Sequence, residues 1–136
     1  MKILVTGGRA YSDKETVYKV LDRVIIDIDE PICIIHGGAN GADSLAEEFC
    51  EERGIPSIVM FARWKRLLRK AGAIRNTWMV KYAQPDYAIA FPGGVGTSNM
   101  IRQCEAAGIP VKRIGDYYDD QDSIIERSNQ GTVSVA

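Results

Sequence analysis

The chain has 136 residues, of which 46% are hydrophobic and 26% charged, and its formal net charge is −1. These values are typical of one soluble globular domain with a real core, and the balanced charge argues neither for nor against nucleic-acid binding. No apolar run has the length of a membrane span, and Met1 leads straight into a strand-like run without room for a signal peptide. We therefore expect a cytoplasmic protein with no membrane partner.

Five short apolar runs predict buried strands, and four segments between them have apolar residues at helical spacing. In chain order the strands are expected at 2–6, 32–36, 57–61, 86–91 and 110–114. The helices are expected at 12–29, 40–53, 71–82 and 97–107. Capping-box spacing marks the start of the first helix, where Ser12 precedes Glu15, and of the second, where Asn40 precedes Asp43.

Strands that alternate with helices imply right-handed crossovers and a parallel sheet covered on both faces. We expect a single Rossmann-like α/β domain of three layers over residues 1–114, with a five-stranded, mostly parallel sheet in the order 3-2-1-4-5. Residues 115–136 fit this pattern less well. They predict a short C-terminal extension, either partly disordered or packed at the interface of a homo-oligomer, with an edge strand near 132–135.

Three glycine-rich turns directly follow predicted strands, at residues 6–9, 36–43 and 92–97. Because parallel strands end at one edge of the sheet, all three turns should lie where such sheets bind ligands. Free N–H groups at a glycine-rich helix start attract anions, so the third turn predicts a phosphate site. The plainer alternative is that each glycine only allows the chain to turn. The dinucleotide fingerprint and the Walker motif are both absent, and scattered cysteines and acids predict no metal and no resident cofactor.

Three stretches occur in a characteristic order, namely Gly37–Asp43, Ala71–Asn76 and Phe91–Thr97. In this combination the chain resembles the SLOG superfamily over about residues 1–114, most closely its YspA-like branch, whose small members are common in bacteria and phages. The superfamily includes the Lonely Guy phosphoribohydrolases and DNA-processing protein A. The resemblance implies a Rossmann-like domain that binds nucleotides or their derivatives.

The turn at 92–97 matches the phosphate-binding P-G-G-x-G-T of the Lonely Guy enzymes, and Arg75 with Met79 matches their R-x-x-x-M element. Those enzymes carry a catalytic glutamate three residues after this turn, where this chain has Met100. A methionine cannot move a proton or stabilise a cationic centre, so the departure weighs against the family's hydrolysis. Asp43 is the candidate to replace this glutamate as the catalytic residue. Its alternative roles are to cap a helix or to accept a hydrogen bond from the ligand.

Binding of a nucleotide-derived small molecule, without turnover, is therefore the leading prediction. The residues expected to bind it are Gly7, Gly8, Arg9, Gly37, Gly38, Ala39, Arg75, Asn76, Pro92, Gly93, Gly94, Gly96 and Thr97. One alternative is a hydrolase that cleaves an N-glycosidic or phosphoester bond with Asp43 as the catalytic residue. A second is single-stranded DNA binding through the basic run at 63–70, which contains Trp64.

Overall fold

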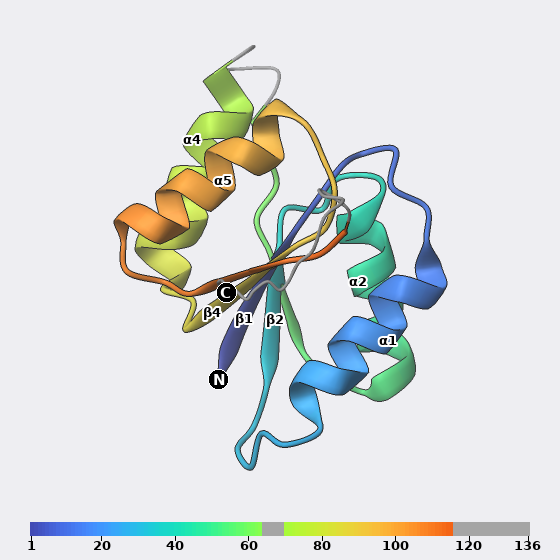
Figure 1. The fold of residues 1–136 in the computed structure, drawn as a ribbon. Helices are drawn as coiled ribbons and strands as arrows, with labels where there is room; N and C mark the ends of the chain where they lie inside the picture. Colours follow the sequence, from blue (N-terminus) through green and yellow to red (C-terminus); the bar gives the residue numbers. More distant parts are fainter. Residues whose placement is uncertain (64–69, 116–136) are drawn as a thin grey trace.

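A five-stranded sheet forms the centre of the computed structural model, which describes residues 1–63 and 70–115 (Figure 1). Its strands are β1 (Lys2–Thr6), β2 (Cys33–His36), β3 (Ser57–Val59), β4 (Tyr87–Ala90) and β5 (Val111–Arg113). All neighbouring strands are parallel, and their order is β3-β2-β1-β4-β5. This architecture confirms the predicted fold and strand order.

Helices cover both faces of the sheet and complete the three layers. They are α1 (Lys14–Ile25), α2 (Ala42–Arg53), α4 (Ala71–Trp78) and α5 (Val95–Ala106), with a π-helical turn η2 (Met79–Ala83) after α4. In Figure 1, α1 and α2 lie on one side of the sheet, and α4 and α5 lie on the other. No helix among the described residues is long and apolar enough to cross a membrane.

Each central strand contributes side chains to two separate apolar clusters, one on each face of the sheet. Ile3 and Val5 of β1 pack with Phe49 in the cluster under α1 and α2, whereas Leu4 packs with Met79 in the cluster on the opposite face. Burial on both faces explains why these strands read as continuous apolar runs rather than alternating ones. Burial on both faces also fixes the alignment of neighbouring strands, so that their carboxyl ends lie at one edge of the sheet.

The helix boundaries differ from prediction in ways that local hydrogen bonds explain. The cap of α1 is Asp13 rather than Ser12, because its carboxylate accepts the Thr16 N–H at 3.1 Å and the Thr16 hydroxyl at 2.6 Å. This helix ends at Ile25 instead of continuing to residue 29. In contrast, α5 begins at Val95, two residues earlier than expected, so the turn at 92–97 includes its first helical residues.

Some predictions fall outside the described residues. They are the central part of the basic run, at 64–69, and the extension from residue 116 onward with its expected edge strand at 132–135. The predictions of an oligomer interface in the extension and of DNA binding by the basic run therefore stay predictions.

Candidate functional site: a pocket at the start of α5

The three glycine turns meet at the carboxyl edge of the sheet, where the first lies between the other two. The Gly8 N–H donates to the Pro92 carbonyl at 2.8 Å, and the Gly8 carbonyl accepts the Ala42 N–H at 3.2 Å. A β-carbon added at Gly41 would overlap the Gly8 carbonyl oxygen, and one added at Gly93 would overlap the Gly8 backbone nitrogen. These glycines are therefore required by the close packing of the turns against one another.

The start of α5 is built differently from the start of α2. Gly94 is the cap residue of α5, and no side chain caps this helix start. Residues Gly94, Val95 and Gly96 are exposed, and a β-carbon added at Gly94 or Gly96 would meet no atom within 4 Å. At α2 the first helical N–H, that of Ala42, is instead taken by the first turn. Of these two helix starts, the open one, with its positive end of the helix dipole, is thus the one at α5.

A pocket of about 440 Å³ opens directly over this helix start. Its lining includes ten of the residues predicted from the sequence: Gly7, Gly8, Arg9, Ala39, Asp43, Arg75, Asn76, Gly94, Gly96 and Thr97. Gly37, Gly38, Pro92 and Gly93, also predicted from the sequence, are not among the lining residues. The sequence reasoning missed six further lining residues, which are Thr6, Gly72, Ala73, Val95, Asn99 and Arg102.

Asp43 is a buried carboxylate that holds the turn before α2. Its Oδ2 atom accepts the N–H groups of Gly37 at 3.0 Å and Ala39 at 3.2 Å, and its side chain is 6% exposed. The predicted capping box with Asn40 is not formed, because the carboxylate reaches past the cap to these earlier N–H groups. Burial raises the pKa of the Asp43 carboxyl, while the two N–H groups and the nearby Arg75 charge act in the opposite direction.

The raised pKa makes stability depend on pH at this residue. A carboxyl whose pKa is higher in the folded state stabilises the fold most below its unfolded pKa, and that contribution is lost as pH rises through the folded pKa. We expect the stability of Asp43→Asn, which can still accept both N–H groups, to increase relative to the wild type as pH rises above the ordinary carboxyl pKa of about 4. Urea unfolding of both proteins at several pH values measures this difference, and a constant difference would contradict the assignment.

Arg75 connects the two sides of the pocket. From α4 its Nη1 donates to the Gly37 carbonyl at 2.9 Å, and its Nε donates to Asn76 Oδ1 at 3.0 Å. Burial lowers the pKa of the guanidinium, and the Arg9 charge acts in the same direction against the opposing effect of Asp43. A partly desolvated cation beside a second arginine is stabilised by an anion, so this arrangement favours a negatively charged ligand.

Asn76 is buried, and its amide is fully engaged within the protein. Its Nδ2 donates to the Gly96 carbonyl at 3.2 Å and to Asn99 Oδ1 at 3.0 Å, while its Oδ1 accepts from Arg75. The side chain thereby connects Arg75 to the first turn of α5. Asn76 thus positions the Arg75 side chain relative to the first turn of α5.

His36, the last residue of β2, has a structural role. Its Nδ1 accepts the Gly38 N–H at 3.0 Å, which leaves Nε2 to donate to Glu47 Oε1 at 2.7 Å. The hydrogen bonds from His36 and Ser57 hold the pKa of the Glu47 carboxyl below its usual range. The ring is buried and does not line the pocket.

The sequence of this chain is similar to those of known proteins. The family model described as the YspA, cpYpsA-related SLOG family matches residues 1–67. The Gene 61 protein of Mycobacterium phage D29 is 35% identical over 122 residues, which cover 85% of this chain and 97% of the phage protein. The chain belongs to the YspA, cpYpsA-related SLOG family. The resemblance inferred from its motifs is thus confirmed.

The SLOG family match includes the first two glycine turns, whereas the turn at α5 lies beyond the matched residues. Among solved structures, the UDP-GlcNAc 2-epimerase of Neisseria meningitidis aligns with a TM-score of 0.49 and 17% identity. The alignment covers 85% of this chain, which spans only 32% of the epimerase chain.

Met100, which the motif resemblance aligned with the Lonely Guy glutamate, lies in the core of this SLOG domain. It is 1% exposed and packs in the same apolar cluster as Leu4 and Met79, outside the pocket lining. Within the part of the chain that the structure describes, Asp43 is the one carboxylate that lines the pocket.

Proposed function

We propose that this protein binds a nucleotide or nucleotide-derived ligand whose phosphate lies at the first turn of α5. The observation that carries the proposal is the uncapped helix start, which opens on a pocket lined by three arginines and one aspartate. Backbone N–H groups at such a start, together with arginine side chains, are suited to phosphate oxygens. The SLOG family and the Rossmann-like fold support a nucleotide as the carrier of that phosphate.

The neighbouring charges favour an anion over a neutral ligand. Asp43 already accepts two backbone N–H groups, whereas Arg75 is held by Gly37 and Asn76 with its Nη2 unused among the described residues. With three arginines against one carboxylate, the lining carries an excess of two positive charges (3 − 1). A phosphate dianion would balance this excess.

Hydrolysis of the bound ligand is the second candidate function, and the buried Asp43 is the observation that favours it. Burial raises its pKa, as in many general acids and bases. Asp43→Asn separates the two functions, because a hydrolase would lose turnover while ligand affinity largely persisted. Equal release of base or sugar by both proteins would exclude catalysis by Asp43.

A thermal-shift screen tests the binding proposal. It compares adenosine with AMP, ADP, ADP-ribose, NAD and cyclic nucleotides, since only the phosphorylated compounds contain the group that the α5 turn would bind. At a hundred times its dissociation constant, a ligand stabilises the folded state by about 2.7 kcal/mol and raises Tm by several degrees. Stabilisation by nucleotides and not by the nucleoside is the expected result. No stabilisation by any of them would overturn the proposal.

A cytoplasmic location and a homo-oligomeric state are part of the same proposal. Size-exclusion chromatography with light scattering measures the oligomeric state directly.

A further inference from the structure

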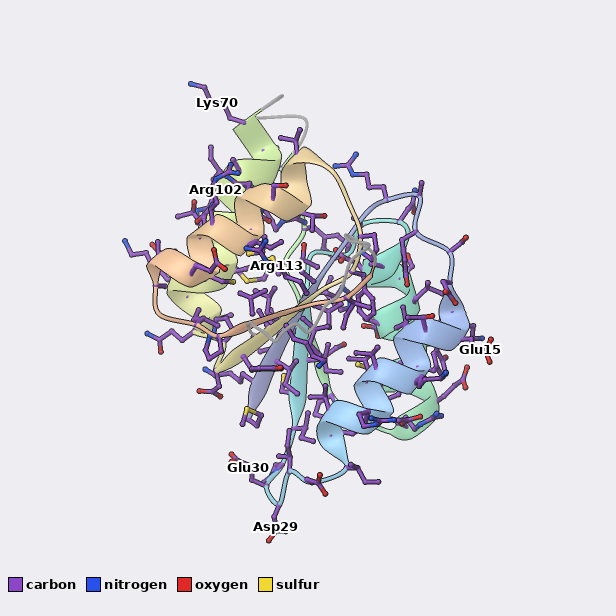
Figure 2. The ribbon with its side chains drawn as sticks, in the orientation of Figure 1. Glu15, Asp29, Glu30, Lys70, Arg102 and Arg113 are labelled. Atoms are coloured by element: carbon purple, nitrogen blue, oxygen red, sulfur yellow. The ribbon has the colours of Figure 1, made fainter. Side chains whose placement is uncertain are left out.

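The pocket extends beyond the phosphate-binding turn, along the contact between α4 and α5. Gly72 and Ala73 of α4 line one wall of this extension, and Asn99 and Arg102 of α5 line the other. Figure 2 shows Arg102 projecting from α5 near α4. The small side chains on α4 leave the space open, and both larger lining residues carry hydrogen-bond donors.

The side-chain amide of Asn99 has a defined orientation. Its Oδ1 atom accepts from Asn76 Nδ2 at 3.0 Å and from Gln103 Nε2 at 2.9 Å. Gln103 is itself attached to α4 through the Ala73 carbonyl at 3.4 Å. Because both donors converge on the oxygen, the nitrogen of the Asn99 amide is the atom left for the pocket. An amide nitrogen donates only, so this position accommodates an acceptor such as a phosphate oxygen.

Arg102 adds a positive charge on the same side of the pocket. The side chains of helical residues lean toward the N-terminus of the helix, so Arg102 extends over the turn that contains Asn99. Nearby Arg113 is paired with Glu105 at 3.0 Å, whereas Arg102 makes no ion pair with any described residue. Asn99 and Arg102 thus place two donors, one of them cationic, a short distance beyond the first turn of α5.

We propose that Asn99 and Arg102 form a second anion subsite, which selects ligands with two linked phosphoryl groups over ligands with one. This inference rests on the proposed function, because the first phosphoryl group is the one at the α5 turn. The second group would accept hydrogen bonds from Asn99 Nδ2 and the Arg102 guanidinium.

Titration calorimetry with inorganic phosphate and pyrophosphate tests the subsite without knowledge of the base. We expect the wild type to bind pyrophosphate about tenfold more tightly than phosphate. A factor of this size corresponds to the gain from one further charge-assisted hydrogen bond. In Arg102→Gln and in Asn99→Asp, which keeps the Oδ1 acceptor, this preference should disappear. Arg23→Gln, an exposed arginine on α1 outside the lining, is the matched control and should keep the preference.

The outcomes separate this inference from the proposed function. Equal affinities for the two anions in the wild type, or equal losses for both anions in Arg102→Gln, would overturn the second subsite and leave the first intact. Absence of phosphate and pyrophosphate binding by the wild type would overturn both. A preference lost equally in Arg23→Gln would show a general charge effect and would also overturn the subsite.

Discussion

Replacing Gly94 by aspartate is expected to lower the affinity for a phosphate-bearing ligand by about 100-fold, whereas Gly94→Asn lowers it far less. A side chain at this position meets no atom within 4 Å, so either residue fits without displacing the turn. Both residues are also good helix caps, which favours an unchanged or slightly increased stability of α5. The two variants have the same shape and differ in one negative charge beside the bound phosphate.

Calorimetric titration of both variants with a nucleotide from the screen measures the effect, and urea unfolding verifies that each is folded. The difference should decrease as salt is added, because screening weakens the repulsion between the carboxylate and the phosphate. Equal affinity of Gly94→Asp and Gly94→Asn would place the phosphate elsewhere.

Gly41→Ala is expected to have the largest effect on stability, with a loss of about 3–5 kcal/mol in the free energy of unfolding. Gly41 has a φ of 79°, and an added β-carbon would overlap the backbone of Gly8 and Arg9. Backbone atoms cannot move aside as a flexible side chain can, so the first turn would have to shift from α2. Because domains are only marginally stable, the loss would lower Tm by roughly 10 °C or more.

Gly54→Ala is the matched control, since Gly54 has a similar φ of 69° but no neighbour within 4 Å of an added β-carbon. Only the conformational cost of about 1 kcal/mol should apply there. Thermal and urea unfolding of the two variants separate backbone strain from the overlap. Equal losses would show that the turns do not pack as closely as the structure indicates.

The fold was predictable because the strands alternate regularly with amphipathic helices, and each strand is buried on both faces. The glycine turns were also recognisable, but their different roles were not. Gly41 and Gly93 allow other turns to approach, whereas Gly94 and Gly96 leave the α5 start open. Sequence spacing does not distinguish these cases, because the neighbours of each glycine come from other parts of the chain.

Asn99 and Arg102 were missed for a related reason. Both lie within a helix, away from any glycine turn, and they reach the pocket only because α4 begins with small residues beside them. Arg75 is distant from Asn99 and Arg102 in the sequence. The hydrogen bonds that link Arg75 to Asn99 through Asn76 were therefore not predictable. Asp43 shows the opposite case, since its importance was evident but its hydrogen-bond partners were not those of a capping box.

The central claim is that phosphate binds the first turn of α5, and residue-resolved NMR tests it most directly. Inorganic phosphate is titrated into the ¹⁵N-labelled wild-type protein while the backbone amide signals are followed. We expect the largest saturable shifts at the amides of Val95, Gly96 and Thr97, with the Ala42 amide less affected because it already donates to Gly8. Saturable shifts that leave these three amides unchanged, or no shifts at all, would contradict the claim.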